Sequence, residues 1–342
     1  MNILPAEWHK QDCVQLTWPH EDTDWRGYLD EVDNCFYNIA KEIVKREKLI
    51  IVCKNIERVR KITSGLDQSR IIYCQIENND TWARDHGGIT VFRDGKPTIL
   101  NYRFNGWGLK FPSNYDNQIT RKLFERGIFN KNTKIEYHKD FVLEGGSIES
   151  DGEGTILTTS RCLMSYNRNE HLDSKEIEKR LKKDLGAERI IFLEHGYLEG
   201  DDTDSHIDTL ARFCSVDTIC YVKCDDSNDP HYYELSMMEE ELKSLKDKNG
   251  NYYNLIPLPM VDPVYYENER LPATYANFLI INDAVLVPIY NCSKDGVALE
   301  IFKDIFKERE VVAVDCSVLI RQHGSLHCVT MQYPEGVLEW EE

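Results

Sequence analysis

The stretch Gly324-Ser325-Leu326-His327-Cys328-Val329-Thr330-Met331 places one cysteine between a flexible Gly-Ser pair and a β-branched run. β-Branched residues favour strands, and functional side chains concentrate in the loops that strands position. We therefore predict that Cys328 lies at a loop-to-strand junction, where a thiol is firmly based and accessible to a ligand. A single cysteine beside a histidine is weak evidence for catalysis, because cysteine is among the most buried residue types.

Four other polar segments lead into apolar, strand-like segments in the same way: residues 79–88, 143–148, 200–213 and 272–281. Their polar landmarks and the cysteine are 59, 62, 71 and 51 residues apart in chain order: Asp85, Glu144, His206, Asn277 and Cys328. This quasi-period of about 60 residues predicts five similar modules arranged around an axis, with their polar strand ends meeting at the centre. An open α/β sheet whose strand ends line a crevice is the alternative.

Hydrophobic spacing predicts the elements within these modules. Helices are expected over residues 29–47, 56–64, near 116–126, and 173–185. Strands are expected over residues 14–18, 49–53, 71–76, 89–92, 98–104, 155–158 and 189–193. No segment reads as a linker or a low-complexity tract, so the sequence predicts a single α/β domain over residues 1–342.

Composition narrows the class of partner. With 59 acidic and 41 basic residues among 342, the formal charge of −18 disfavours nucleic acid and anionic membranes and favours a cationic ligand. Eleven cysteines without a CxxC pair argue against a disulfide framework and a thiolate zinc site. The N-terminus lacks the pattern of a signal peptide, and no apolar run is long enough for a membrane span. We expect a cytoplasmic protein with reduced thiols and no membrane contact.

The junctions together offer Asp85, Glu144, His206, Asp208 and Cys328. On an extended segment His206 and Asp208 project to the same face, because they are two positions apart. Two interpretations fit these groups. The histidine, both aspartates and the cysteine would be mixed N, O and S ligands for zinc or iron. Alternatively, a thiol nucleophile and an acid/base act on a planar guanidinium held by two carboxylates, which uses every group.

Five ordered motifs resemble those of the agmatine deiminase family, also called bacterial peptidylarginine deiminase-like proteins. They are Trp82-Ala83-Arg84-Asp85, Leu143-Glu144-Gly145-Gly146, residues 203–208 with Asn167-Arg168-Asn169, Tyr275-Ala276-Asn277-Phe278, and His327-Cys328-Val329-Thr330. The resemblance extends from residue 17 to residue 332. It implies a five-bladed α/β propeller, the pentein fold, with pseudo-five-fold symmetry and an active site on the axis that uses neither a metal nor another cofactor.

Roles follow from the resemblance where the motifs match. Cys328 resembles the nucleophile, His206 the general acid/base, Asp85 and Asp208 the guanidinium-binding carboxylates, and Glu144 the acid that orients the histidine. Trp82, Tyr275 and Asn277 fall within matched motifs and are expected at the substrate, with a packing role as the alternative for Trp82.

The implied reaction is hydrolysis of agmatine to N-carbamoylputrescine and ammonia through a covalent thiouronium, a step of putrescine biosynthesis. Free or peptidyl arginine is the alternative substrate, and a homo-oligomer is compatible with the sequence. Two glycines of the family pattern are missing: Ser205 stands where many members have glycine before the histidine, and the last glycine of the Gly-Gly-Gly stretch before the nucleophile is not retained. These departures put the local backbone conformation in question.

Overall fold

The strands of the computed structural model, which describes residues 2–339, form six separate β-sheets, and none of them closes on itself within that range. The first sheet has the order β19 (Thr330–Pro334), β2 (Gln11–Thr17), β3 (Lys48–Cys53), β4 (Ile71–Gln75). The second has the order β1 (Asn2–Ile3), β5 (Ile89–Arg93), β6 (Lys96–Arg103), β7 (Lys134–Val142). Three sheets have three strands each: β10 (Arg189–Leu193), β9 (Thr155–Thr159), β8 (Ile148–Ser150); β11 (Ala211–Ser215), β12 (Thr218–Lys223), β13 (Asn254–Pro259); and β16 (Leu279–Ile281), β17 (Ala284–Ile289), β18 (Glu310–Asp315). The sixth is the hairpin of β14 (Tyr265–Tyr266) and β15 (Glu269–Arg270).

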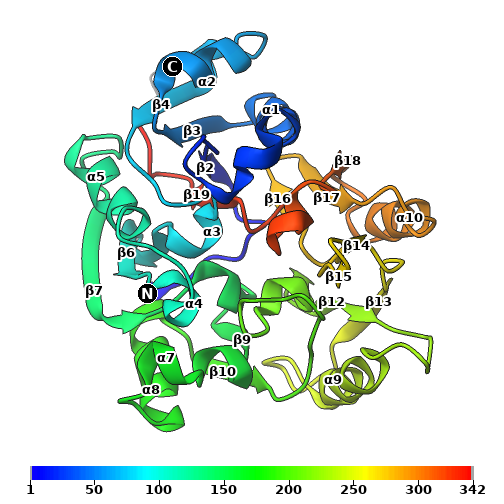
Figure 1. The fold of residues 1–342 in the computed structure, drawn as a ribbon. Helices are drawn as coiled ribbons and strands as arrows, with labels where there is room; N and C mark the ends of the chain where they lie inside the picture. Colours follow the sequence, from blue (N-terminus) through cyan, green and yellow to red (C-terminus); the bar gives the residue numbers. More distant parts are fainter. Residues whose placement is uncertain (1, 340–342) are drawn as a thin grey trace.

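One unit recurs in the five larger sheets. Two antiparallel strands pair, and a helix carries the chain from the second of them to a third, parallel strand: β5-β6-β7, β8-β9-β10, β11-β12-β13, β16-β17-β18 and β19-β2-β3. In the last of these units β19 comes from the far end of the chain. Parallel neighbours need such a crossover, because a tight turn joins only antiparallel strands. The crossover helices are α1 (Leu29–Val44), α2 (Ile56–Ile62), α5 (Ile119–Glu125), α8 (Ser174–Leu185), α9 (Tyr232–Ser244) and α10 (Asp295–Ile305). They lie on the periphery, and the beginnings of the units face the middle of the molecule (Figure 1).

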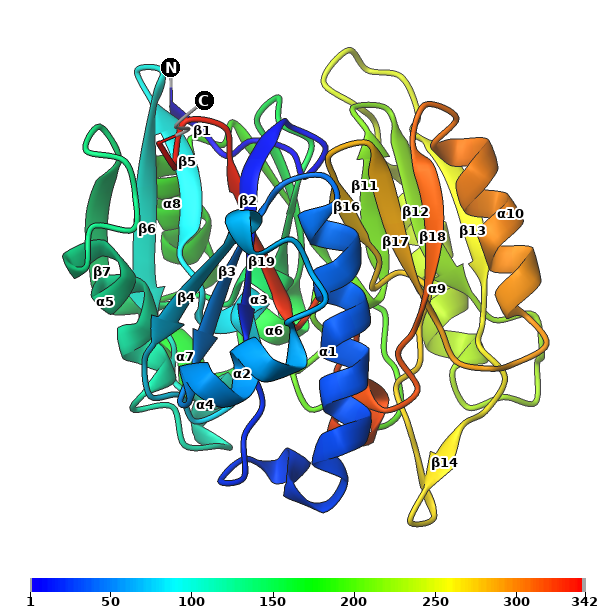
Figure 2. The same ribbon diagram turned by 90° about the horizontal axis from the view of Figure 1, so that it is seen from above.

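The two ends of the chain share one sheet. The last strand, β19, pairs antiparallel with β2, with Thr330 opposite Leu16, and Figure 2 shows the two strands side by side. The first sheet is therefore completed only when the C-terminal strand adds to it. Cys328, two residues before β19, is fixed by a pairing that spans the whole chain.

Local sequence explains the helix ends. In α8 the side chain of Asp173 accepts a hydrogen bond from the Glu176 amide, while the Glu176 side chain accepts one from the Asp173 amide. This reciprocal capping satisfies two amides that no helical carbonyl can reach. Gly186 ends the helix with φ of 71°, in the left-handed region that glycine adopts without a Cβ clash. These signals account for the close match between α8 and the predicted helix over 173–185.

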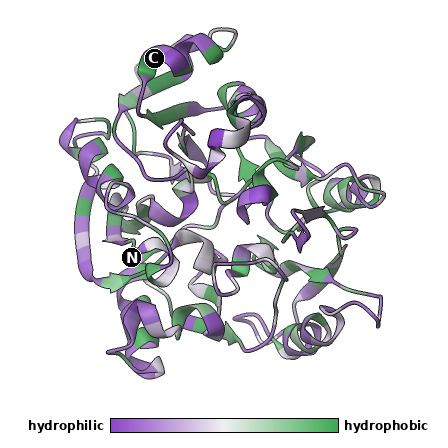
Figure 3. Ribbon diagram, in the orientation of Figure 1, coloured by the Kyte–Doolittle hydropathy of each residue, from purple (hydrophilic) through white to green (hydrophobic). Residues whose placement is uncertain are grey.

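Apolar residues concentrate on the strands, as the hydropathy colouring in Figure 3 shows. The core strand β3 is an almost continuous apolar run whose residues 49–53 are all buried. The ring of Trp18 packs edge-on against Phe36 of α1, with centroids 5.4 Å apart, and its indole N–H donates to Asp33. By contrast, the short helix α3 (Ala83–His86), near the centre of Figure 3, is hydrophilic although its residues are buried.

The predicted helices and strands are confirmed, with ends shifted by a few residues. Helix α1 ends at Val44 rather than at 47, and β2 begins at Gln11 rather than at 14. Segment 79–88, expected as a loop, contains the helical turn α3, whose Arg84 amide donates to the carbonyl of Cys328 at 3.1 Å. Within residues 2–339 no helix has both the length and the apolarity to cross a lipid bilayer. All eleven cysteines lie in this range, and each is unpaired.

Candidate active site

The polar residues that precede the first strand of each larger sheet converge at the centre of the molecule. Asp85 lies on α3 before β5, and Glu144 precedes the turn η4 (Gly145–Ser147), which leads into β8. His206 and Asp208 flank the start of the turn η5 (Ile207–Thr209), ahead of β11. Backbone bonds tie these junctions together, since His327 N donates to the Asn277 carbonyl at 3.1 Å, just before β16.

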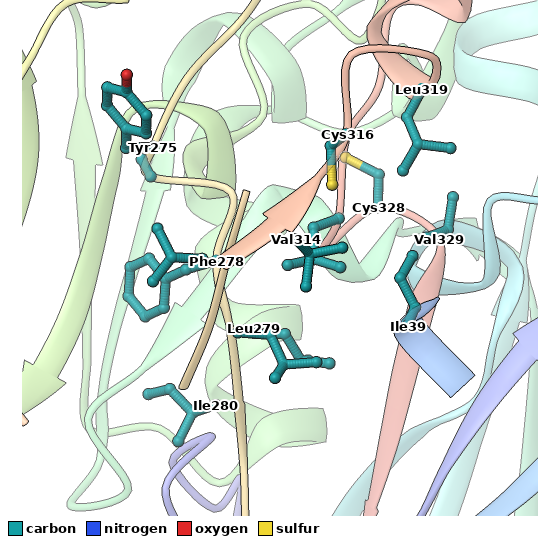
Figure 4. Packing of buried hydrophobic residues seen from close by; sticks show 14 of the residues in the cluster. Ile39, Tyr275, Phe278, Leu279, Ile280, Val314, Cys316, Leu319, Cys328 and Val329 are labelled. Carbon is teal, nitrogen blue, oxygen red and sulfur yellow. The ribbon is translucent and has the colours of Figure 1, made fainter. Parts of the chain in front are cut away.

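The Cys328 thiol is almost completely buried and contacts two site residues. Its Sγ lies 3.4 Å from Asn277 Oδ1, to which the S–H can donate, and 4.0 Å from Asp208 Oδ2. Figure 4 shows Cys328 among apolar side chains that include Val329 and Cys316. Burial, with the negative charges of Asp208 and Asp85, raises the thiol pKa well above its usual value. Without a cation beside it the group is therefore a neutral thiol.

Asn277 fixes the position of Cys328. Its Oδ1 accepts hydrogen bonds from the amides of His327 at 2.9 Å and Cys328 at 3.3 Å. Its amide nitrogen donates to the carbonyl of Asp208 at 3.3 Å. One side chain thus joins the cysteine segment to the histidine-aspartate segment, although they are far apart in the sequence.

Three of the expected catalytic groups surround Gly146. A Cβ built on this glycine would lie 2.6 Å from His206 Nδ1, 2.9 Å from Asp85 Oδ1 and 3.1 Å from Asp208 Oδ2. Real Cβ atoms do not approach other atoms so closely, so only glycine fits here without displacing the three groups. Gly146 lies within a matched motif, but no role is predicted for it from the sequence.

The carboxylate of Asp85 is held from two sides. Its Oδ1 accepts a hydrogen bond from the amide of Gly146 at 3.1 Å, and its Oδ2 accepts one from the indole of Trp107 at 2.8 Å. Burial and the nearby charge of Asp208 raise its pKa to about 6, against the lowering effects of His206 and Trp107. A bound cation would favour the ionised form.

The imidazole of His206 is fully buried among acidic groups. Its Nδ1 lies 3.6 Å from Asp85 Oδ1, and neither ring nitrogen makes a hydrogen bond to the residues described in the structure. Burial lowers the pKa of His206, but Asp85, Cys162 and Glu144 outweigh it and raise the pKa well above the usual value. The ring therefore favours the protonated, imidazolium form.

Glu144 lies near this histidine, but its hydrogen bonds go elsewhere. Both carboxylate oxygens lie 3.0 Å from Arg168 Nε, and Arg168 also donates to Asp204 at 2.6 Å and to the carbonyl of Thr203 at 2.8 Å. The carboxylate that forms the ion pair with His206 is that of Asp85. The prediction that Glu144 orients the histidine thus rests on proximity and charge rather than on a direct hydrogen bond.

The metal-ligand interpretation can be compared with the donor groups that the fold assembles. Within residues 2–339 two compact sets of possible ligands occur: Glu144 with Cys162 and His206, and Glu7 with Glu149 and His327. Neither set is the proposed one of His206, Asp208, Asp85 and Cys328. The arginines at 168 and 212 pair with the glutamates of these sets, so a dication would meet fixed positive charge in both places.

A cavity of about 330 Å³ leads to the thiol and to Asp85. Its lining comprises Asp24, Asp80, Trp82, Asp85, Trp107, Phe111, Asp202, Thr203, Gln322, His323, Gly324 and Cys328. Since Asp24 is exposed whereas Asp85 and Cys328 are at most 5% exposed, the cavity runs inward from the surface. Trp82 forms part of its wall, as expected for a substrate-binding residue.

Tyr275 is placed differently from the prediction. It is fully buried, does not line the cavity, and its hydroxyl donates to Asp295 Oδ1 at 2.7 Å. In Figure 4 it lies well apart from Cys328. Its structural surroundings are those of a packing residue, because its single polar atom is bonded to the first turn of α10.

Trp107 both lines the cavity and holds Asp85, and no role is predicted for it from the sequence. Trp107 has φ of 54°, an uncommon value for a bulky residue. Such strain gathers at functional sites, but it is invisible in a sequence.

Ser205, which stands where many family members have glycine, has a backbone conformation that favours glycine. It has φ of 66°, next to Asp204 with φ of 67°, and its buried hydroxyl has no hydrogen-bond partner among the described residues. Both features destabilise the folded protein when serine occupies this position.

We expect Ser205→Gly to raise the free energy of unfolding by about 1 kcal/mol, because glycine removes the Cβ strain and the unpaired hydroxyl. Urea denaturation would measure this, with Ser205→Ala as the control that keeps Cβ; lower stability of the glycine variant would contradict it.

Known proteins resemble this chain along its whole length. Residues 3–334 match the Porphyromonas-type peptidyl-arginine deiminase family. An agmatine deiminase of Pseudomonas aeruginosa strain LESB58 is 33% identical, over 97% of this chain and 95% of its own length. The structure of a Porphyromonas gingivalis protein assigned as an arginine deiminase is 50% identical, covering 99% of this chain and 100% of that one with a TM-score of 0.95. A cysteine-to-serine variant of C. jejuni agmatine deiminase, solved with substrate bound, is 38% identical, covering 98% and 97% with a TM-score of 0.92. The motifs, the converging junctions and these likenesses agree, and the chain belongs to the Porphyromonas-type peptidyl-arginine deiminase family, among whose relatives are agmatine deiminases.

Proposed function

We propose that this protein hydrolyses agmatine to N-carbamoylputrescine and ammonia, with Cys328 as the nucleophile. The observation that carries the proposal is the cavity, which has a thiol and a carboxylate at its inner end and acidic groups toward the surface. Relatives named as agmatine deiminases, one of them solved with substrate, support it.

The lining of the cavity matches a linear molecule with a cation at each end. Asp85 and Asp208 provide carboxylates for a guanidinium beside Cys328. Trp82, Trp107 and Phe111 provide an apolar wall for the methylene chain. Asp24, Asp80 and Asp202 line the same cavity and would receive the distal ammonium.

Substrate binding would convert the Cys328 thiol to the reactive thiolate. The guanidinium replaces water beside two carboxylates and brings a positive charge next to the thiol, which lowers the thiol pKa and releases a proton to solvent. The same charge favours ionised Asp85, whose pKa is about 6 without it. Held between the two carboxylates, the guanidinium carbon faces the sulfur.

The covalent steps then follow. The Cys328 thiolate forms a C–S bond to the guanidinium carbon, and the His206 imidazolium protonates one nitrogen, which departs as ammonia when its C–N bond breaks. Neutral His206 next takes a proton from water, and the resulting hydroxide attacks the thiouronium carbon. The hydroxyl group of this tetrahedral adduct loses its proton to solvent as the C–S bond breaks, which returns the thiolate and leaves the carbamoyl product.

We also propose a fold type and a cellular compartment for the protein. Five ββα-β units with their first strands facing a common centre support a five-bladed propeller of the pentein type, formed by one domain over residues 1–342. Eleven unpaired cysteines favour a reducing compartment, such as the cytoplasm.

Arginine is the competing substrate, and one assay separates the two. Among the residues that line the cavity, all of them within 2–339, there is no lysine or arginine to pair with an α-carboxylate. Ammonia release should therefore be measured with agmatine, free arginine and a peptide with C-terminal arginine. We expect agmatine to give the highest kcat/KM, and a preference for either arginine substrate would overturn the proposal.

Asp202 is the residue we expect to recognise the distal ammonium. Burial and the neighbouring Asp201 raise its pKa to about 6, so the carboxylate gains from a cationic partner. We expect Asp202→Asn to raise KM for agmatine about 10- to 100-fold while kcat changes much less, because the guanidinium end is untouched. The exposed residue Asp225 provides a control, Asp225→Asn, with the same change of charge. A fall in kcat at unchanged KM would show that Asp202 acts in another way.

A further inference from the structure

His327, directly before the nucleophile, makes a short contact with a substrate-binding carboxylate. Its Nδ1 lies 2.7 Å from Asp208 Oδ2, and the side chains of both residues are almost fully buried. An ionised carboxylate only accepts hydrogen bonds, so Nδ1 must carry the proton and donate it. Neither the cavity lining nor the reaction steps above include His327.

The opposite edge of the ring is held as firmly. Nε2 lies 2.7 Å from Glu7 Oε2 and 3.1 Å from Arg212 Nη2. If Nε2 accepts a hydrogen bond from Arg212, it carries no proton and the ring is neutral. If Nε2 instead donates a proton to Glu7, both nitrogens are protonated and the ring is an imidazolium. In both forms Nδ1 keeps its proton and donates it to Asp208. Burial and the charges of Arg212 and Arg84 lower the pKa of His327, which favours the neutral form.

The contact leaves Asp208 with one oxygen committed and one free. Oδ2 receives the histidine, whereas Oδ1 is buried and has no hydrogen-bond partner among residues 2–339. An unpaired buried carboxylate oxygen is costly unless a ligand completes its bonding. Because Oδ2 approaches Cys328 Sγ at 4.0 Å, the orientation of this carboxylate also sets where a guanidinium lies relative to the sulfur.

We propose that His327 is a positioning residue, which holds Oδ2, fixes the orientation of the Asp208 carboxylate and leaves Oδ1 free to accept a hydrogen bond from the substrate guanidinium, and that Glu7 and Arg212 hold the histidine in that orientation. The inference rests on the proposed function. It assigns a role to the N-terminal segment, since Glu7 lies ahead of β2 and reaches the site through this contact and its ion pairs with Arg212 and Arg84.

Charged groups surround the contact on every side. Glu7 comes from the N-terminal segment, Arg84 and Asp85 from α3, Glu149 from β8, His206 and Asp208 from the η5 junction, and Arg212 from β11. Burial raises the pKa of Asp208, but the hydrogen bond from His327 leads the effects that lower it below the usual value. Loss of the donor therefore raises the Asp208 pKa, and the acidic limb of kcat/KM moves to higher pH, because only ionised Asp208 binds the guanidinium.

Two amide substitutions distinguish positioning from bulk packing. In His327→Asn the amide nitrogen takes the place of Nδ1 and still donates to Asp208. In His327→Gln it takes the place of Nε2 and reaches Glu7 and Arg212 instead. We expect the asparagine variant to keep kcat/KM for agmatine within about 10-fold of wild type, and the glutamine variant to lose about 10- to 100-fold more, with higher KM and an acidic limb shifted upward.

The control is the same pair of substitutions at His138, which lies between Glu136 and Asp184 on the outer strand β7. Neither control should move the pH profile. The positioning role is overturned if the glutamine variant matches or exceeds the asparagine variant, or if its acidic limb stays in place. Absence of agmatine turnover by the wild-type protein would instead refute the proposed function, so the two failures are distinguishable.

Discussion

Replacing Cys328 by serine is expected to lower kcat for agmatine by roughly 10⁴- to 10⁶-fold, because the covalent route requires the nucleophile. A serine hydroxyl has a far higher pKa than a thiol, and the acidic surroundings that already raise the pKa of Cys328 would hold it neutral even with substrate bound. Agmatine affinity should change little, since the carboxylates, the aromatic wall and the acidic lining stay in place. Ammonia release and calorimetric titration measure these two quantities.

The matched control is Cys316→Ser, which changes a fully buried cysteine of the same apolar cluster (Figure 4). Burial also raises the thiol pKa of Cys316, but the residue does not line the cavity. Its substitution should affect stability without an effect of comparable size on kcat. Near-normal turnover by Cys328→Ser would exclude this residue as the nucleophile.

Gly146→Ala is expected to lower kcat/KM by at least about 100-fold, the loss that a displacement of about 1 Å in a catalytic group can cause. The added methyl would lie 2.6 Å from His206 Nδ1, 2.9 Å from Asp85 Oδ1 and 3.1 Å from Asp208 Oδ2. At least one of these groups must move, and each has a separate role in the proposed reaction. The Gly146 amide would also lose its alignment with Asp85.

The control for this methyl is Gly27→Ala, because a Cβ on Gly27 meets no atom within 4 Å and its φ is ordinary. Circular dichroism and thermal unfolding would show whether each variant is folded. A folded Gly146→Ala protein with wild-type kcat/KM would mean that the three groups do not act together on one substrate.

The elements and their repetition could be predicted from sequence because they depend on local pattern. The strand at 189–193 and the helix at 173–185 have clear periodicity and capping residues, and the structure places them within a residue of those limits. The pairing of β19 with β2 could not be read from such patterns, since hydrophobic alternation does not state which strands are neighbours. The turn α3 was missed because four residues provide too little periodicity.

For the site, sequence indicated the chemical groups but not their partners. Asp85, His206, Asp208 and Cys328 come together as expected, whereas Glu144 bonds to Arg168 and Tyr275 packs away from the cavity. Which partner each side chain contacts depends on the direction in which it points, and the spacing of residues along the sequence does not determine that direction. The proposed roles of three residues could not be read from residue type. Gly146 matters because it has no Cβ, whereas Trp107 and His327 act through hydrogen bonds to Asp85 and Asp208.

The central claim is that Cys328 attacks a guanidinium carbon held by Asp85 and Asp208. Rapid acid quenching of the wild-type protein during its first turnovers with agmatine, followed by mass analysis of its peptides, tests this most directly. We predict an adduct with the mass of agmatine less ammonia on Cys328, and on none of the other ten cysteines. Full turnover with Cys328 unmodified at every quench time, or an adduct on a different residue, would contradict the mechanism.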